Sequence, residues 1–220
     1  MRLCQFNCHL LGNDWASAMV DTQCGKRNYR GWCCLHKIFS SAMVDEMDFE
    51  CPVFRKLFAI EKDLKTNFEQ TALIRLCWSN PQLLDRELWF LPELLKEAGA
   101  LDHADRSAAM YYLARSQWPI HFNSHNFRLI WEAECRGGRL TLPHIIKHTP
   151  AILNRNSRFV KLLLTGARER DHKGHSAFYY AVHSHWHSNF CSKHFITLST
   201  EAHELKEKKL KDFLSEKRLL

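Results

Sequence analysis

The sequence predicts an all-α protein. It combines 45% hydrophobic with 25% charged residues, which is typical of a folded chain rather than a disordered one. Its eight glycines and six prolines are few for a sandwich or barrel that needs many tight turns. The mixed polar and apolar stretches at residues 93–98 and 199–220 are typical of helices instead. At 220 residues, the chain is long enough for one sizeable core or for a stack of short units.

Two segments of the chain repeat the same order of residues. One runs from Leu94 to Tyr112 and the other from Leu162 to Ala181, at an offset of 67 to 69 residues. Each contains a Leu-Leu pair, a Gly-Ala pair, a polar turn with an Asp, and then a Ser-Ala followed by two tyrosines. Such self-similarity predicts a repeat architecture, in which each unit buries an apolar face only against its neighbour.

This order of residues is similar to the ankyrin repeat, whose first helix begins with Gly-x-Thr-Pro-Leu-His-x-Ala. Residues 31–38 keep the Gly, the Leu and the His, and residues 174–181 keep the Gly, a Ser in place of Thr, and the final Ala. Residues 70–73 and 141–144 keep shorter parts. The positions equivalent to the Thr are spaced by 38, 36, 34 and 35 residues, at Cys33, Thr71, Ser107, Thr141 and Ser176. The observed offset is about twice the ankyrin period.

The resemblance implies an ankyrin-type α-solenoid of about five degenerate helix-turn-helix repeats. The repeats are expected over residues 26–198, preceded by an N-terminal cap over 1–25 and followed by a capping helix over 199–220. Ser199 or Thr200 would begin that helix, and its apolar stripe has helical spacing. The alternative for this end is a basic segment, Lys206–Lys211, that contacts a membrane or an acidic partner.

Within each repeat, the Ser or Thr hydroxyl is expected to cap the first helix. Gly99 and Gly166 are expected to end second helices in the left-handed conformation. Asp102 and Asp171 then fall in the polar turns between repeats. The stretch that begins at Asn80-Pro81 departs from the family pattern, because Pro92 interrupts its leucines.

Charge and cysteine usage point to a protein of the cytosol, or of a host cytosol after delivery. The net charge is +7, but acidic residues are interspersed, so general nucleic-acid binding is not expected. The nine cysteines are odd in number, and polar residues such as Asn7 and His9 break any apolar leader. We therefore expect reduced thiols and no transmembrane segment.

One group of side chains has the spacing of metal ligands. His183, His187, Cys191 and His194 would share one stripe of a continuous helix. The alternative is a loop of exposed histidines, because a helix of that length is unusual in an ankyrin unit. A looser group has spacing that suits zinc poorly, at Cys24, Cys33, Cys34 and His36.

No catalytic motif and no cofactor-binding fingerprint occurs in the chain, so an enzyme is not expected. The ankyrin resemblance implies a scaffold that binds another protein through its concave face and its inter-repeat turns. An effector-like role follows by analogy only. In each tyrosine pair, one ring is expected in the core, and the other either packs in the core as well or lines the groove. The groove alternative selects partner-binding candidates at Tyr111, Trp118, Tyr179 and Trp186. The alternative function is a metal-binding protein or metal-dependent enzyme centred on His187, Cys191 and His194.

Overall fold

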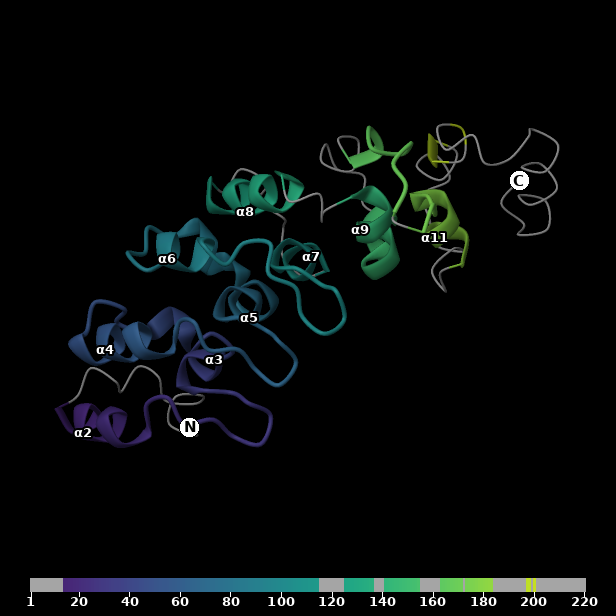
Figure 1. Ribbon diagram of the computed structural model, residues 1–220. Helices are drawn as coiled ribbons and strands as arrows, with labels where there is room; N and C mark the ends of the chain where they lie inside the picture. The colour runs from purple at the N-terminus through teal and green to yellow at the C-terminus, as the bar shows by residue number, and fades with distance from the viewer. Residues whose placement is uncertain are drawn as a thin grey trace. The chain divides into compact units, whose positions relative to one another are not determined.

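The computed structural model describes residues 14–114, 125–136, 141–154, 163–171, 173–183, 197–198 and 200. These residues form nine α-helices and three 3-10 helices and contain no strand (Figure 1). One isolated antiparallel bridge joins Arg170 and Ser176. The all-α prediction is therefore confirmed. In the described part of the chain, no helix has the length and apolar character needed to cross a membrane.

The chain divides into two compact units, Met1–Glu134 and Cys135–Leu220. In the first unit the helices form two rows (Figure 1). The first row consists of α3 (Cys34–Ile38), α5 (Ala72–Ser79) and α7 (Ala108–Ala114), and the second row consists of α2 (Asp14–Gln23), α4 (Pro52–Glu61), α6 (Leu91–Leu95) and α8 (His125–Arg136). Helix α5 packs against both α3 and α7 within the first row, and α4 packs against α2 within the second. The rows are joined where α3 contacts α4 and α5 contacts α6.

The second unit contains α9 (Leu142–His148), a 3-10 helix over Pro150–Asn154 and α11 (Ala177–His183). Helices α9 and α11 pack against each other. The predicted C-terminal helix lies outside the described residues except for Thr200. At the other end, α2 occupies part of the predicted N-terminal cap.

Five helices begin directly after the five Thr-equivalent positions, which confirms the predicted helix starts. They are α3, α5, α7, α9 and α11. Capping by the hydroxyl is clearest at Thr71, whose Oγ1 accepts a hydrogen bond from the Ile74 amide at 3.2 Å. Ser176 Oγ likewise accepts from the Tyr179 amide at 3.0 Å. The side-chain oxygen satisfies an amide that has no partner inside the helix, which is why such residues begin helices.

A glutamate 27 or 28 residues after the Thr-equivalent position accepts hydrogen bonds at the starts of α3, α7 and α9. Glu61 is buried, and its Oε2 accepts from the Leu35 amide in the first turn of α3 at 2.7 Å. Glu134 is also buried and accepts from the Ala109 amide of α7 at 3.2 Å, as well as from the hydroxyl of Ser107. A carboxylate is favoured here because the first amides of a helix carry partial positive charge.

The same contact recurs in the second unit. Glu169 Oε2 accepts from the Leu142 amide, the first of α9, at 2.8 Å. Glu97 occupies the corresponding place for α5, close to Thr71. The four glutamates recur at intervals of 36, 37 and 35 residues, which are close to the intervals between the helix starts. They are Glu61, Glu97, Glu134 and Glu169.

The prediction for the two glycines holds at Gly99 and is wrong at Gly166. Gly99 has φ +90°, the left-handed conformation expected after a helix. Gly166 does not have a positive φ. A side chain at Gly166 would instead lie about 3.0 Å from the carboxyl group of Glu169. Gly166 thus leaves room for the glutamate that caps α9.

The stretch that departs from the family pattern has a regular structure. Asn80 ends α5, and its Nδ2 donates to the carbonyls of Phe39 at 2.8 Å and Ser41 at 3.0 Å, which closes the end of α3 in the preceding repeat. Pro81 opens a 3-10 helix over Pro81–Asp85. Pro92 lies in the first turn of α6, where a proline costs no hydrogen bond, so it starts a helix there.

The core of the first unit is aromatic. Phe90 is fully buried and lies 5.2 to 5.6 Å from the ring centroids of Phe39, Phe49, Phe54 and Phe58. These rings come from both rows and from the segments between them. Their packing fixes the first-row helices relative to the second row, and truncating such a ring costs about 3–5 kcal/mol.

Candidate binding groove at the stacked turns

The turns that precede α3, α5, α7 and α11 share one hydrogen-bonding pattern. A polar side chain at the first position accepts from the amides two and four residues later. At Asp102, Oδ1 accepts from Ala104 at 2.8 Å and from Arg106 at 3.0 Å. The equivalent acceptors in the other three turns are Asn28, Thr66 and Asp171. This local bonding holds the turn without help from a sheet.

The fourth position of every one of these turns has a left-handed backbone. The φ angles are +73° at Gly31, +58° at Glu69, +56° at Asp105 and +79° at Gly174. Non-glycine residues rarely adopt this conformation, and here two of them do. The other hydrogen bonds of the turn hold this backbone conformation, and the side chains of Glu69 and Asp105 are exposed.

The three turns of the first unit stack on one another through backbone hydrogen bonds. The Arg30 carbonyl accepts from the Asn67 amide at 3.1 Å, and the Phe68 carbonyl accepts from the His103 amide at 3.0 Å. Asn67 Nδ2 also donates to the Tyr29 carbonyl at 3.0 Å. A side chain at Gly31 would overlap Asn67 at 2.3 Å. The stack therefore requires a glycine at that position, both for its φ and for this close approach.

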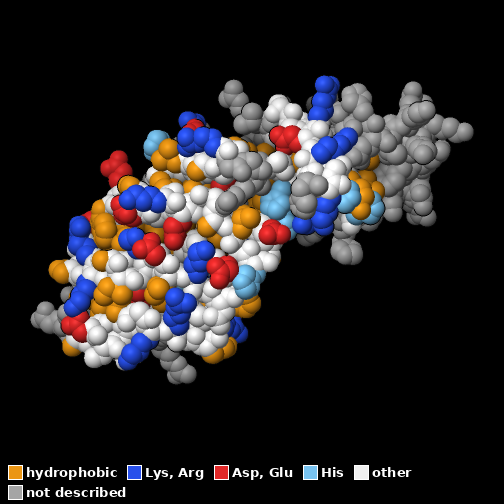
Figure 2. Space-filling view, viewed as in Figure 1, with side chains coloured by type: hydrophobic (Ala, Val, Ile, Leu, Met, Phe, Trp, Pro, Cys, Tyr) orange, Lys and Arg blue, Asp and Glu red, His pale blue; other side chains and the backbone are white. Residues whose placement is uncertain are grey.

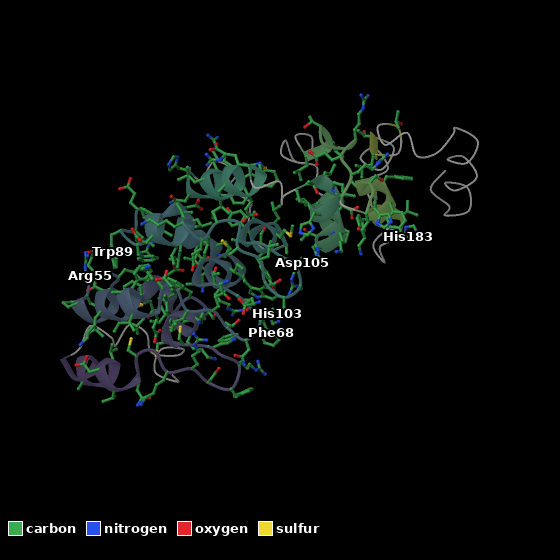
Figure 3. All side chains as sticks on the ribbon, viewed as in Figure 1. Arg55, Phe68, Trp89, His103, Asp105 and His183 are labelled. Atoms are coloured by element: carbon green, nitrogen blue, oxygen red, sulfur yellow. The ribbon has the colours of Figure 1, made fainter. Side chains whose placement is uncertain are left out.

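A groove of about 360 Å³ lies between these turns and the first-row helices. It is lined by Arg30, Trp32, Phe68, Gln70, Arg75, Asp102, His103, Ala104 and Arg106. Figure 3 shows Phe68, His103 and Asp105 together on the side of the turns, away from Arg55 and Trp89. In Figure 2, Lys and Arg side chains alternate with hydrophobic ones over the first unit.

Cations and aromatic rings alternate along the groove. The Arg75 guanidinium lies 4.2 Å and the Lys37 ammonium 4.4 Å from the ring centroid of Trp32. Arg106 lies 5.7 Å from the centroid of Trp78 and 4.7 Å from that of Tyr111. These distances are those of cation–π contacts, which orient both guanidinium groups, and that of Arg106 is also paired with the Asp102 carboxylate.

Positive charge is concentrated at this end of the first row. The pKa of Lys37 is lowered, first by burial and then by the nearby charges of Arg75 and Arg30. Burial also lowers the pKa of His36 to about 4, and Arg75 contributes in the same direction. His36 is therefore neutral at physiological pH.

Asp102 is the carboxylate of the groove, and its oxygens are engaged. Besides the two turn amides, it accepts from the Tyr111 hydroxyl and from Arg106 Nη2 at 3.2 Å. Burial would raise its pKa, but these hydrogen bonds and the Arg106 charge hold the pKa below its ordinary value. The pKa of Tyr111 is raised by burial and by its bond to Asp102.

The second unit repeats this pairing. Tyr180 donates its hydroxyl to Asp171 at 2.5 Å, with the same nine-residue separation as Tyr111 and Asp102. The ring of Tyr179 stacks on His175 with centroids 4.0 Å apart, and His183 follows at 4.3 Å from Tyr179. Both tyrosines are half-buried. Tyr179 thus retains part of its surface, but so does Tyr180, and neither ring is fully in the core as was expected of one of them.

The structure corrects the expectation that one member of the first tyrosine pair lines the groove with an open ring. Tyr111 and Tyr112 are both buried, and Tyr111 exposes only 3% of its surface. Its hydroxyl is held by Asp102, and its ring packs on Trp78 with centroids 4.3 Å apart. Trp78 is the ring that reaches the surface, at 39% exposure. Tyr111 therefore supports the groove from beneath.

Several other candidates lie outside the described residues, namely Trp118, Trp186, His187, Cys191 and His194. Among the described residues, no group of three or more His, Cys, Asp or Glu side chains is placed to hold a metal ion. The group of Cys24, Cys33, Cys34 and His36 accordingly does not converge on a metal site. Cys33 Sγ lies 3.0 Å from His36 Nδ1, but burial raises the pKa of this thiol, so a reactive thiolate is not formed.

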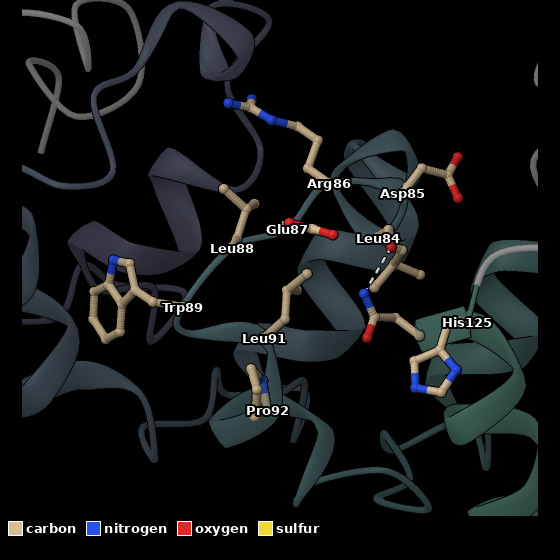
Figure 4. A pocket seen from close by; sticks show the side chains of 10 residues that line it. Leu84, Asp85, Arg86, Glu87, Leu88, Trp89, Leu91, Pro92 and His125 are labelled. Carbon is tan, nitrogen blue, oxygen red and sulfur yellow. Dashed lines mark hydrogen bonds between the residues drawn. The ribbon is translucent and has the colours of Figure 1, made fainter.

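A second and larger hollow, of about 1010 Å³, lies beside the 3-10 helix and α6 (Figure 4). Its lining mixes Asp85, Arg86 and Glu87 with leucines, Trp89, Pro92 and the start of α8. Asn126 Nδ2 donates across it to the Leu84 carbonyl at 2.9 Å. Two carboxylates, one arginine and the rings of Trp89 and His125 line this hollow, so it lacks the three arginines found in the lining of the groove.

Comparisons of the chain with protein-family models, with curated proteins and with solved structures find no match. The function is therefore argued from the geometry of its own residues.

Proposed function

We propose that the chain is an ankyrin-type α-solenoid that binds another protein through the groove and the stacked turns of its first unit. The observation that carries this proposal is the ladder formed by Arg30, Asn67, Phe68 and His103, in which backbone hydrogen bonds join the turns and the Asn67 side chain adds one bond to the Tyr29 carbonyl. Because the backbone makes the ladder, the side chains on the turns are left for other contacts. Loops held on a rigid scaffold commonly serve as binding surfaces.

The composition of the groove supports the same proposal. Trp78 and Phe68 expose 39% and 53% of their surfaces, and Tyr29 is largely exposed. Partly exposed aromatic rings next to arginines are the residues that dominate protein interfaces. Five helix starts in register with the ankyrin hallmark, at intervals of 34 to 38 residues, support the solenoid half of the proposal.

The test is affinity capture with the full chain as bait, comparing Phe68→Ala with Ile60→Ala. Phe68 is on a turn of the groove, whereas Ile60 is on α4 in the second row and is exposed to nearly the same extent, 50%. We expect a protein that is retained by the unchanged chain and by Ile60→Ala but lost with Phe68→Ala. A retained set that is identical for all three baits would overturn the assignment of the site.

A further inference from the structure

We infer that the hollow beside α6 is a second docking site of the first unit, and that it binds a partner segment in which an apolar side chain lies between two cationic ones. The hollow, of about 1010 Å³, is formed by the 3-10 helix Pro81–Asp85, the segment that follows it, α6 and the start of α8 (Figure 4). It shares no lining residue with the groove, and Figure 3 shows Trp89 on the side away from Phe68 and His103. Binding in the hollow therefore does not depend on the function proposed for the groove.

The floor of the hollow is apolar and partly open. Leu84 and Leu91 are buried, whereas Leu88 and Trp89 are half-buried and Pro92 is exposed. A hollow of this size admits several side chains of a partner. An apolar side chain that packs on this floor removes apolar surface of both molecules from water, which favours binding.

The lining is held in place before a partner arrives. Trp89 Nε1 donates to the Phe49 carbonyl at 2.9 Å, and its ring makes a T-shaped contact with Phe58 at a centroid distance of 5.2 Å. Asn126 Nδ2 donates to the Leu84 carbonyl at 2.9 Å, which joins the start of α8 to the 3-10 helix. A lining with its own hydrogen bonds loses little conformational entropy when a partner binds.

Two carboxylates at the hollow have no partner. Asp85 and Glu87 are exposed, and neither has a hydrogen bond or an ion pair within the described part of the chain. The next charges along α6, Glu93 and Lys96, pair with each other at 2.7 Å. Arg128 of α8 is not part of the lining. The charges of Asp85 and Glu87 are therefore available to a partner.

The two neighbouring arginines do not offset these charges, because each has a carboxylate of its own. Arg86 Nη1 lies 3.7 Å from Asp45 Oδ1. Arg55 lies 4.5 Å from the ring centroid of Trp89 and pairs with Glu50. When both arginines and their carboxylates are counted, two negative charges still remain at the hollow. Cationic groups of a partner complement this excess.

Separate cationic side chains fit these carboxylates better than a metal ion or a polyanion does. Asp85, Glu87 and His125 are the lining residues that could bind a metal ion, but no three such groups converge among the described residues. A nucleic acid or an anionic lipid surface would meet unpaired negative charge. The Lys or Arg side chains of a peptide can each reach one carboxylate while the residue between them packs on Leu88 and Trp89.

The experiment measures binding of fluorescent synthetic peptides to the full chain by anisotropy, at about pH 8, where histidine side chains carry little charge. The peptides have equal length and a central Leu with one Arg on each side. In the comparison peptides both arginines are replaced by Gln or by Glu, or the Leu is replaced by Ser. We expect the affinity to fall by about 2- to 5-fold for each Arg that is removed, and further with Glu. Added salt should weaken binding of the Arg peptide most.

Two variants separate the charge from the floor. Glu87→Gln should weaken binding of the Arg peptide by about 2- to 5-fold and leave that of the Gln peptide unchanged. Leu88→Ala should weaken both. Glu69→Gln is the matched control for charge, because Glu69 is an exposed glutamate on a turn of the groove. Ile60→Ala is the apolar control, because Ile60 is exposed on α4 outside the lining. Neither control should change the affinity.

Each contrary outcome has its own meaning. Equal affinities for the Arg and Gln peptides would overturn the cationic partner. Equal losses in Glu87→Gln and Glu69→Gln would show that binding follows net charge and would overturn the site. Displacement of the Arg peptide by MgCl₂, beyond that by NaCl of equal ionic strength, would replace the peptide with a divalent cation. The proposed function of the groove is decided separately, by capture with Phe68→Ala.

Discussion

Replacing Glu97 with glutamine should make the protein more stable, and only at neutral and higher pH. Glu97 occupies the place of the helix-capping glutamates, but its Oε2 is shielded and has no hydrogen-bond partner within the described residues. Burial raises the pKa of its carboxyl to about 7, and Asp63 acts in the same direction. The Thr71 hydroxyl, the Leu73 amide and Lys65 lower it by less.

The sign of the effect follows from this raised pKa. In the unfolded chain the carboxyl titrates near 4.5, so between about pH 4.5 and 7 the folded state holds a proton that the unfolded state has released. The stability that this proton provides is complete below about pH 4.5 and is lost as the pH rises through 7. The difference between the carboxyl pKa in the unfolded and in the folded state corresponds to about 3 kcal/mol of stability. Because Glu97 is partly exposed to solvent, we expect about 1–2 kcal/mol.

Glutamine has the shape of the protonated acid and does not titrate. Urea unfolding of Glu97→Gln and of the unchanged chain should give nearly equal free energies at about pH 4.5, and a gain of about 1–2 kcal/mol for the variant at about pH 8. Glu61→Gln is the internal comparison, because Glu61 accepts from the amides of Gly25 and Leu35 and an amide side chain has only one acceptor oxygen. That variant should be less stable. If Glu97→Gln has the same pH profile as the unchanged chain, the reasoning about Glu97 is wrong.

Three further expectations follow from the same contacts. Glu134→Gln should lower the free energy of unfolding by about 2 kcal/mol, measured in urea, because one of its two contacts to the start of α7 is lost. Gly174→Ala should lower the free energy of unfolding by about 1 kcal/mol because Gly174 has a positive φ. Gly31→Ala should lower it further, because Gly31 also has a positive φ and Asn67 occupies the space of the added side chain. Equal losses for the two variants would count against the stacked turns. Cys135 should react with a thiol reagent in the folded protein well before Cys77, because Cys135 is exposed while Cys77 is buried; the modified site is read by peptide mass mapping.

The helix starts were predictable because their cause is local. The side-chain oxygen caps the helix at Thr71, Ser107 and Ser176, whereas Cys33 and Thr141 precede their helices without a side-chain cap hydrogen bond. The prediction for Gly166 failed because its reason is tertiary. Glu169 lies only three residues after Gly166, but its carboxyl group is held close to Gly166 while it accepts from the Leu142 amide at the start of α9, 27 residues earlier in the chain.

The repeated glutamates show a signal that was present in the sequence but outside the family motif. Their period is as regular as that of the helix starts, at 36, 37 and 35 residues between Glu61, Glu97, Glu134 and Glu169. A glutamate on a helix is usually solvated, so each of these residues taken singly would be assigned to the exposed face of its helix. Pairing the two periods predicts the contact, because each glutamate follows its own helix start by 26 to 28 residues.

Tyr111 was expected at the surface of the groove but is buried, and Trp78 is the ring that is exposed instead. A tyrosine that follows a turn looks suited to a groove, yet the Asp102 carboxylate nine residues earlier draws its hydroxyl inward. The ring of Tyr111 then supports Trp78, which keeps part of its face open. An aspartate nine residues earlier therefore predicts that the tyrosine hydroxyl is hydrogen-bonded, as the pair of Asp171 and Tyr180 indicates, but it does not predict burial, because Tyr180 is only half-buried.

Each turn contains positions that hold its conformation and positions whose side chains are open to contacts with a partner. The first, fourth and fifth positions of each turn are committed to its hydrogen bonds and its left-handed backbone. At the second and third positions the ladder runs through backbone atoms and the side chains are exposed, although that of Asn67 also donates to the Tyr29 carbonyl. Those side chains differ from turn to turn at no cost to the fold. Specificity can thus change at these positions while the ladder beneath them stays the same.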